Sequence, residues 1–543
     1  MTINLLCHVL LPGAIGWLLS LLLEGLLTPR PVAPWRRSGA AHCVHAGLWL
    51  VLYALELALF RRPVFAVLNV LAIQFLVILV SNVKYSTLRE PFVYTDFEYF
   101  VDALRHPRLY LPFFGRIKAA LAAAGYAVVL FTGLTMEQAL TSAGGLWTLM
   151  LQDAVDPSMA VWSLPFFWAA MACLVVCGWL LAQWGVIRPS TMPTFDTGDD
   201  LRRLGLATVL WRYRASERTC FVVPERHWRA PDDGYSNGAK FAERPDIVVV
   251  QSESFFDARR DFLSIKPDVL SQFDVLNAES VAAGRLRVAA WGANTVRTEF
   301  AFLSGLEPST LGVHRYNPYR KLARSGVSTL ASHLQQHGYR TVCVHPYPAS
   351  FYARDTVYPL MGFETFLDID AFADEERFGP YVSDAAVARK IDALLGDARD
   401  HKPLFVFAIT MENHGPLHWE TVGPSDRTRF FDAPLSPDFD DLVAYTRHLA
   451  NADAMFGQLA ERLIRHDRSA VLCIYGDHVP IMPTVYAAAG EPDGLTDYVI
   501  WRPPGQGMQH APAQRDEIRP VETLADDILH AAFAPNAIDV TAS

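Results

Sequence analysis

The chain has 543 residues, of which 51% are hydrophobic, and its formal net charge is −10 at pH 7. An acidic chain without a basic stripe does not indicate a nucleic-acid partner. Its 7 cysteines include no Cys-x-x-Cys pair, which argues against a zinc knuckle or a dithiol redox motif. Long apolar runs dominate the first third, and an ordinary mixture of charged loops and short apolar runs follows. We therefore expect one membrane block and one large globular domain.

Several segments of the first third are apolar and long enough to cross a bilayer, which takes ~20 residues. We expect five such helices, at 4–27, 44–60, 64–83, 117–135 and 159–184. The first has no basic residues before its apolar core, so we interpret it as a retained helix and not as a cleaved signal. Residues 1–185 are thus predicted to form a transmembrane domain of about five helices, and residues 186–243 a linker.

The distribution of Lys and Arg gives one indication of sidedness. Basic residues gather in the loops at 30–37 and 84–118, whereas the loop at 136–158 has none. Counted literally, the positive-inside rule places the globular domain in the cytoplasm. The chemistry expected of that domain favours the opposite side, and we expect it there.

From residue 244 onward, short apolar runs alternate with helical patterns. The runs lie at 245–254, 341–345, 404–410, 469–478 and 498–501, and the helical patterns at 327–338, 384–399 and 443–466. Continuous apolar runs of this length are typical of buried parallel strands. We predict an α/β domain over 244–543, with helices on both faces of its sheet.

Polar side chains stand where four of these strands end. Glu253 closes the first run, His345 the second, His414 follows the third, and Asp477 and His478 close the fourth. Each of them alone is more often a helix cap or a satisfied loop residue. Because ligands of such sheets bind at the carboxyl ends of the strands, their joint placement indicates a single site.

Glu253, Asp477 and His478 together offer two carboxylates and an imidazole, a set that suits a divalent cation such as Mn²⁺ or Zn²⁺. The segment GANTVRTEF supplies a nucleophile, Thr295, at the start of a helical pattern. The helix dipole and a bound metal would both lower the pKa of its hydroxyl. The alternatives are that Thr295 is only an N-cap residue, or that Thr298 takes its place.

The motifs VVVQSES, GANTVRTEF, HPYPASFYARD, TMENHGP and YGDHVP together resemble one family. They are similar to those of the lipoteichoic-acid synthases and the periplasmic-glucan phosphoglycerol transferases, which share a sulfatase-like fold of the alkaline-phosphatase type. The resemblance spans the helix block and nearly all of 245–535. It implies five transmembrane helices in the cytoplasmic (inner) membrane, with the catalytic domain outside.

The resemblance also implies a reaction. Glu253, Thr295, Asp477 and His478 would bind one catalytic metal, Mn²⁺ in the best-studied relatives, with Zn²⁺ or Mg²⁺ as alternatives. Thr295 would attack the phosphorus of phosphatidylglycerol, diacylglycerol would leave, and a phosphoglycerol-threonine intermediate would form. An acceptor hydroxyl on an envelope glycan, a glycolipid or a polyglycerol-phosphate chain would then take the group.

Three further residues fit the handling of a phosphate. Arg354 offers a planar, permanently charged fork, His414 can stabilise the phosphate or protonate the leaving alkoxide, and His345 can bond the headgroup. One residue departs from the family pattern: Arg297 stands where relatives often carry a small or acidic residue. That difference bears on the acceptor or the local charge balance, and leaves the nucleophile unaffected.

Three other functions compete with this hypothesis. A phosphoethanolamine transferase acting on an envelope lipid or glycan shares the helix count, the threonine and the metal. A true sulfatase needs Cys or Ser within C/S-x-P-x-R, and the sequence has no such motif. A non-catalytic scaffold for an envelope polymer would have no need of the complete set of expected metal ligands.

Overall fold

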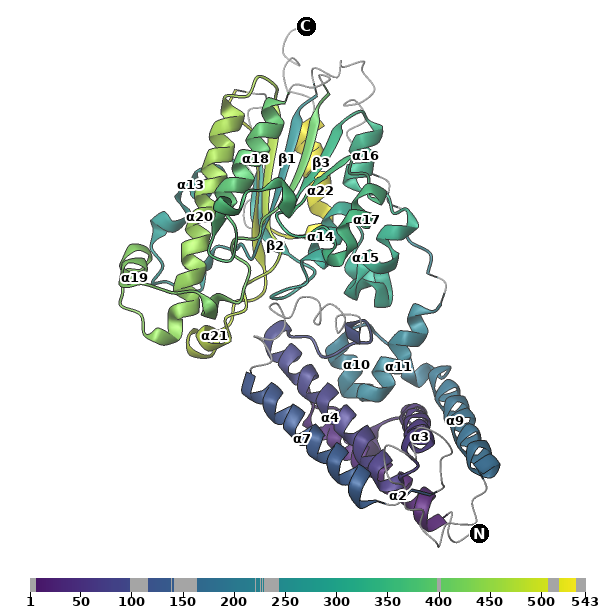
Figure 1. The fold of residues 1–543 in the computed structure, drawn as a ribbon. Coiled ribbons are helices and arrows are strands. Elements are labelled where there is room, and N and C mark those ends of the chain that lie inside the picture. The colour runs from purple at the N-terminus through teal and green to yellow at the C-terminus, as the bar shows by residue number, and fades with distance from the viewer. Residues whose placement is uncertain are drawn as a thin grey trace. The chain divides into compact units, whose positions relative to one another are not determined.

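The computed structural model describes residues 6–97, 116–137, 139–140, 164–219, 221–224, 226, 228, 244–397, 402–505 and 517–533. The chain divides into two compact units, Met1–Cys220 and Phe221–Ser543, which we describe separately (Figure 1).

Helices make up the first unit. They are α2 (Leu11–Leu23), α3 (Gly39–Phe60), α4 (Pro63–Leu88), α7 (Arg116–Met136) and α9 (Leu164–Val186). Four described segments are long and apolar enough to cross a membrane, namely His8–Leu26, Gly39–Phe60, Pro63–Leu88 and Pro165–Val186. Helix α7 occupies the fourth span expected from the sequence. The first residues of the expected first and fifth spans, at 4–5 and 159–163, lie outside the described residues.

Small residues bring two of these helices together. A Cβ atom added at Gly47 of α3 would lie 2.4 Å from the carbonyl oxygen of Gly178 in α9, and one added at Gly178 would lie 2.7 Å from the oxygen of Gly47. Close backbone approach of this kind is how apolar helices gain packing contacts in a lipid environment. Near the end of the first apolar segment, the fully buried Glu24 forms an ion pair with Arg37.

Part of the stretch expected to be a linker, 186–243, is helical. Helices α10 (Thr197–Leu204) and α11 (Leu206–Glu217) belong to the first unit. The Asp196 carboxylate caps α10 by accepting from the backbone N–H of Asp199 at 2.8 Å. The Thr208 hydroxyl donates to the carbonyl oxygen of Ala41 at 3.1 Å, which fastens α11 to α3. Most of 220–243 lies outside the described residues.

The second unit is built on a sheet whose strand order is β10-β2-β9-β8-β1-β7-β3-β4. The strands are β1 (Asp246–Ser252), β2 (Ala282–Arg287), β3 (Arg340–Val344), β4 (Thr365–Leu367), β7 (Leu404–Ile409), β8 (Ala470–Gly476), β9 (Thr496–Trp501) and β10 (Ile518–Pro520). A separate hairpin pairs β5 (Arg377–Phe378) with β6 (Tyr381–Val382). The neighbours β8, β1, β7 and β3 are parallel, so their carboxyl ends meet at one edge.

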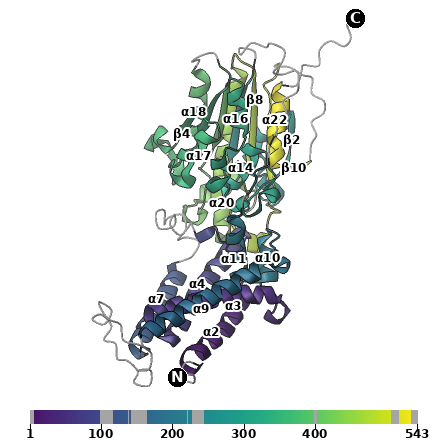
Figure 2. The same cartoon turned by 90° about the vertical axis from the view of Figure 1, so that its right-hand side faces the viewer.

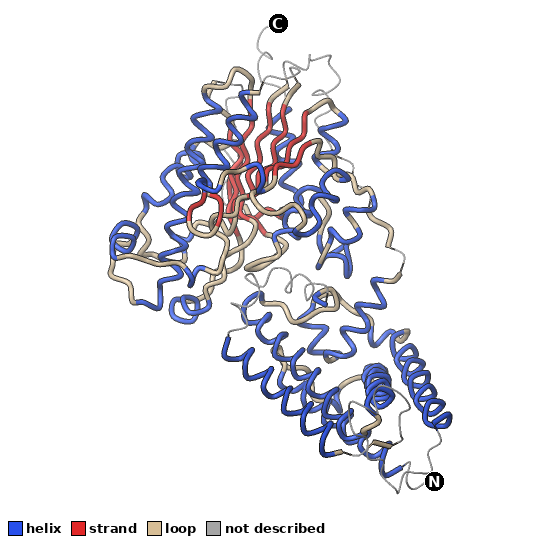
Figure 3. Tube along the Cα trace, viewed as in Figure 1, coloured by secondary structure: helices blue, strands red, loops and turns tan. Residues whose placement is uncertain are grey.

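Alternate residues of β1 face two separate hydrophobic cores. Val248 and Val250 pack into one core, and Ile247 and Val249 into the other. The first core is covered by α13 (Ser271–Ala278), α18 (Asp384–Gly396) and α20 (Asp440–Ile464), and the second by α14 (Thr295–Ser304), α16 (Leu330–Gln336) and α22 (Leu524–Phe533). Figures 1, 2 and 3 show these helices on the two faces of the sheet. This arrangement confirms the predicted α/β class.

The run at 498–501 was expected to be a parallel strand, and that expectation is wrong. Strand β9 runs antiparallel to both β8 and β2. The connection between β8 and β9, residues 477–495, contains the short helix α21 (Pro483–Ala489). A short apolar run that is buried on both faces fits a strand of either direction, so its pattern does not distinguish a parallel strand from an antiparallel one.

We expect Phe302→Ala to lower the free energy of unfolding by about 3–5 kcal/mol, because it empties a filled core position. Phe302 is fully buried on α14, and its ring lies 5.6 Å from that of Phe407 and 5.0 Å from that of Tyr475. Thermal unfolding of the purified full-length protein in detergent measures the change. Leu263→Ala, at a position 86% exposed, is the control and should leave the midpoint nearly unchanged. Equal midpoints for the two variants would contradict the packing described.

Candidate active site

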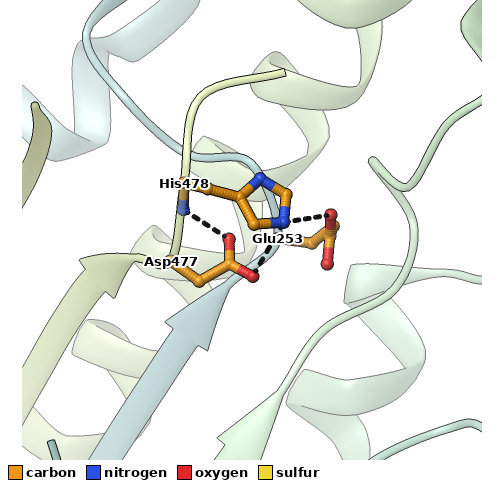
Figure 4. Close-up of side chains that lie close together, drawn as sticks. All are labelled: Glu253, Asp477 and His478. Atoms are coloured by element: carbon orange, nitrogen blue, oxygen red, sulfur yellow. Dashed lines mark hydrogen bonds and ion pairs between the residues drawn. The ribbon is translucent and has the colours of Figure 1, made fainter. Parts of the chain in front are cut away.

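The structure brings Glu253, Asp477 and His478 together at the carboxyl edge of the sheet. Ligand atoms of all three lie within 4.8 Å of one another (Figure 4). The Nε2 atom of His478 is 3.3 Å from Oδ2 of Asp477 and 3.6 Å from Oε1 of Glu253. All three side chains are buried, and Glu253 Oε2 and Asp477 Oδ2 have no hydrogen-bond partner among the described residues. Two inward-facing acceptor oxygens without a donor fit a bound cation.

Hydrogen bonds hold these three side chains in place. Oδ1 of Asp477 accepts from the backbone N–H groups of Ser254 and His478, both at 2.9 Å. The hydroxyl of Ser254 donates to Oε1 of Glu253 at 3.0 Å. The ring N–H of His478 at Nδ1 donates to the carbonyl of Val479 at 3.2 Å, which leaves the lone pair on Nε2 facing the carboxylates. This is the tautomer that a metal ligand requires.

The pKa of Glu253 also fits a bound cation. Burial, reinforced by the neighbouring Asp477 carboxylate, raises the pKa of Glu253 to about 8. A cation among these groups would offset both effects and stabilise the ionised form. The residues therefore fit a single divalent metal, held by two carboxylates and one imidazole.

Thr295 is the first residue of α14 and is partly exposed. One turn later, the Thr298 hydroxyl donates to the carbonyl oxygen of Asp477 at 2.9 Å. Residues three apart in a helix share a face, with Cβ atoms about 5–6 Å apart, so this bond fixes the Thr295 end of α14 beside the metal-ligand loop. Thr298, the alternative nucleophile, uses its hydroxyl for that structural bond.

Arg354 is fully buried at the start of α17 (Arg354–Leu360), and its guanidinium donates to Glu299 of α14 at 2.8 Å. The hydroxyls of Tyr319 and Tyr358 donate to the other oxygen of Glu299. Burial raises the pKa of Glu253 and lowers that of His345; the positive charge of Arg354 partly offsets the first shift and adds to the second. The alternative of a surface salt bridge does not apply to a pair this deeply buried.

The two histidines lie at the ends of neighbouring strands. His345 follows β3, and its Nδ1 lies 3.3 Å from the carbonyl of Ile409. His414 follows β7, and its Nδ1 donates to the carbonyl of Gly415 at 2.7 Å. Burial, with Arg354 nearby, lowers the pKa of His345 well below its ordinary value, and burial also lowers the pKa of His414. Both rings are therefore neutral at pH 7.

Backbone geometry marks three of these positions. The residue after Glu253 and the residues before Thr295 and Arg354 all have left-handed backbone, at φ values of 54° for Ser254, 67° for Asn294 and 54° for Ala353. Residues other than glycine seldom adopt this conformation, and it clusters at functional sites. Arg297, the departure from the family pattern, is buried and donates from Nε to the carbonyl of Tyr316 at 3.1 Å.

Two features of the site have only a weak signal in the sequence. The first is the ion pair of Glu299 with Arg354, and the second is the cluster of Glu412, His448 and Glu420, in which Glu412 lies two residues before His414. A Glu within a short helix or a His in a long helix is common on any surface. Only the fold shows that both are buried.

Comparison with known proteins agrees with the geometry. A model of the sulfatase family matches residues 245–534. The chain belongs to the sulfatase family. This confirms the sulfatase-like family expected from the motifs.

Relatives extend the comparison. The capsular polysaccharide biosynthesis protein RkpI of Rhizobium meliloti is 33% identical over 298 residues, which cover 54% of this chain and 52% of that protein. A putative cyclic beta-1,2-glucan modification protein of the same organism is 27% identical over 269 residues, covering 49% and 41%. The chain thus spans about half the length of the curated relatives it matches.

One solved structure matches nearly the whole chain. It is the lipooligosaccharide phosphoethanolamine transferase A (EptA) from Neisseria meningitidis, an integral membrane protein. The TM-score is 0.54 at 14% identity, and the match covers 97% of this chain and 99% of that one. At this identity the likeness shows the fold, which includes the helices of the first unit.

We expect the stability of the metal-free protein to fall as the pH rises from about 4.5 toward about 8. In that window the folded state keeps a proton on Glu253 that the unfolded chain releases, so the unfolded state gains with rising pH. Saturating Mn²⁺ should remove this loss and raise the unfolding temperature more at about pH 8 than at about pH 6, because protons compete with the metal. Thermal unfolding with a chelator or with Mn²⁺ measures both.

The control for this experiment is Glu253→Gln, which replaces the titrating carboxyl group with an amide. The unfolding temperature of this variant should respond less to both pH and Mn²⁺. A midpoint that does not respond to Mn²⁺ in the unsubstituted protein would contradict a metal site among these residues.

Proposed function

We propose that this protein is a metal-dependent transferase that moves phosphoglycerol from phosphatidylglycerol to a glycan or polyglycerol-phosphate acceptor of the cell envelope, through a phosphothreonine intermediate on Thr295. The observation that carries the proposal is the buried trio Glu253, Asp477 and His478, with two unpartnered carboxylate oxygens. The helix that begins with Thr295 is attached to this trio by the hydrogen bond from the Thr298 hydroxyl to the Asp477 carbonyl.

In the first half-reaction, the Thr295 oxygen attacks the phosphorus of the lipid. The new Oγ–P bond replaces the P–O bond to diacylglycerol, and the proton lost by Thr295 balances the one gained by the departing oxygen. A divalent cation held by Glu253, Asp477 and His478, with Thr295 as a further ligand, would supply the charge that stabilises the alkoxide. Arg354 and His345 would hold the phosphate oxygens and the headgroup.

In the second half-reaction, an acceptor hydroxyl attacks the same phosphorus and restores Thr295. His414 suits the role of base. Its Nδ1–H is engaged by the Gly415 carbonyl, so Nε2 carries a lone pair, and its lowered pKa keeps the ring neutral. A neutral imidazole can take the proton of the incoming hydroxyl.

Separate observations support the proposed donor and the proposed acceptor. The motifs around Glu253 and Thr295 resemble those of the phosphoglycerol enzymes. The names of the curated relatives, which refer to a capsular polysaccharide and a cyclic glucan, support a glycan acceptor. The full-length likeness to EptA keeps transfer of phosphoethanolamine as the second candidate. Incubation with labelled phosphatidylglycerol or phosphatidylethanolamine, followed by mass spectrometry of the Thr295 adduct, separates the two.

We further propose that residues 1–185 form a transmembrane domain of about five helices, and that residues 244–543 form a catalytic domain outside the cytoplasmic membrane. Lipid donor and envelope acceptor meet on that side. This arrangement opposes the positive-inside count of the loops.

Thr295→Ala should reduce diacylglycerol release by a factor on the order of 10³ or more, because no nucleophile remains to form the intermediate. Thr295→Ser, which keeps a hydroxyl, should retain measurable release and serves as the matched control. Thin-layer chromatography of labelled lipid products measures both. Unchanged release by Thr295→Ala would remove this residue from its role and would favour the scaffold hypothesis.

A reporter that is active only outside the cytoplasm should be active when it is fused after Ser543. A second reporter that is active only in the cytoplasm should be inactive when it is fused at the same position. The expected result follows from an odd number of crossings that begins with a cytoplasmic N-terminus. A cytoplasmic result would support the distribution of Lys and Arg and would refute an external active site.

A further inference from the structure

A tight turn follows strand β7 and lies beside the metal ligands. Its first and last residues, Met411 and His414, are joined by the hydrogen bond from His414 N–H to the Met411 carbonyl at 3.1 Å. Thr410, immediately before the turn, accepts from the backbone N–H of Glu253 at 2.9 Å. The parallel register of β1 and β7 pairs Gln251 with Ile409, so the turn continues level with Glu253.

The second residue of the turn, Glu412, is fully engaged. Its carboxylate accepts from the backbone N–H of Asp384 at 2.7 Å, from Nδ1 of His448 at 3.0 Å and from the side-chain amide of Asn451 at 2.6 Å. Although burial opposes it, hydrogen bonds to Glu412 and Glu420 raise the pKa of His448 to about 9, so the ring is doubly protonated. The turn is thereby fixed to α20 by a charged network.

The third residue, Asn413, is the opposite case. It is 3% exposed, yet neither its amide nitrogen nor its amide oxygen makes a hydrogen bond within the described part of the chain. Burial without a partner is rare for an amide, because both its donor and its acceptor lose their bonds to water. The charged network on Glu412 holds this amide next to His414, at the edge where the metal ligands lie.

We propose that the Asn413 carboxamide binds the hydroxyl groups of the transferred glycerol unit and so selects it among phosphate-bearing headgroups. The inference rests on the proposed function and specifies how that site recognises its donor. A carboxamide both donates and accepts, and so does a hydroxyl, so a glycerol unit can satisfy both amide atoms. An ammonium group only donates and would leave the amide N–H groups unpaired.

Glu412 of this turn and Asp384, whose backbone N–H donates to it, are poor partners for an ammonium group. Glu412 is occupied by three donors. Burial, with the neighbouring Glu412 charge, raises the pKa of Asp384 well above its ordinary value, which favours its neutral form. A neutral amide among engaged or neutral acids is matched to a neutral polyol.

The experiment uses the purified full-length protein in detergent with Mn²⁺. Titration calorimetry measures the binding of glycerol 1-phosphate, phosphoethanolamine and inorganic phosphate to the unsubstituted protein, to Asn413→Leu and to Asn413→Ala. Asn413→Leu keeps the branched shape and the number of heavy atoms, and it removes the unpaired polar atoms. We expect it to weaken glycerol 1-phosphate about 10-fold, to change inorganic phosphate less than about 2-fold, and to unfold at the same or a higher temperature. Asn277→Leu on α13, away from the site, is the control.

Each outcome decides the matter. An equal loss of all three ligands, or a lower unfolding temperature for Asn413→Leu with tight glycerol 1-phosphate binding in Asn413→Ala, would show a structural role and overturn the inference. So would unchanged binding in both variants. If the unsubstituted protein releases diacylglycerol only from phosphatidylethanolamine and prefers phosphoethanolamine, the proposed function fails as well. Phosphoglycerol transfer that proceeds with unchanged donor preference in Asn413→Leu refutes the inference alone.

Discussion

Two buried carboxylates that face each other constrain this protein more than any other interaction. Glu253 and Asp477 lie within a few ångströms in a region from which water is excluded, where like charges repel strongly. A single imidazole, that of His478, cannot neutralise both. Either a proton or a cation must be present, and the raised pKa of Glu253 is the direct expression of that requirement. Every role assigned to the neighbouring residues follows from the position of this charge.

The sheet explains how residues more than 200 positions apart meet. The register of the parallel strands β1 and β8 pairs Ser252 with Gly476, so the next residues, Glu253 and Asp477, emerge level with each other. A slip of one residue would turn one carboxylate to the other face. On the far side of β1, strand β7 delivers the turn with Asn413 and His414 at the same height. The chemistry of the site is thus a property of strand pairing as much as of residue type.

The central strands and the location of the site can be predicted from the sequence. Four central strands are continuous apolar runs that end in polar residues, and this pattern identifies both the strands and the edge where ligands gather. Strand β2 carries no such signal, because its residues include Gly284 and two arginines and it is only partly buried. Strand β9 is a similar apolar run, yet it pairs antiparallel with β8, because apolar character alone does not reveal the direction of a strand.

The sequence also does not predict the ion pairs between residues that lie far apart in the chain. Glu299 and Arg354, and likewise Glu412 and His448, are ordinary charged residues until the fold buries them together. Nothing local distinguishes them from residues on a solvated helix. By contrast, Thr295 stands out through its place at the start of a helical pattern within a distinctive motif.

The ion pair between Glu299 and Arg354 has a consequence for turnover. The guanidinium already shares its charge with a carboxylate that two tyrosine hydroxyls hold in place. Under the proposed function, an incoming phosphate would meet a cation that is partly neutralised, and it would be held less firmly than by a bare arginine. Because that reaction must pass the same group on to a second substrate, such moderation would keep the covalent adduct from becoming a resting state.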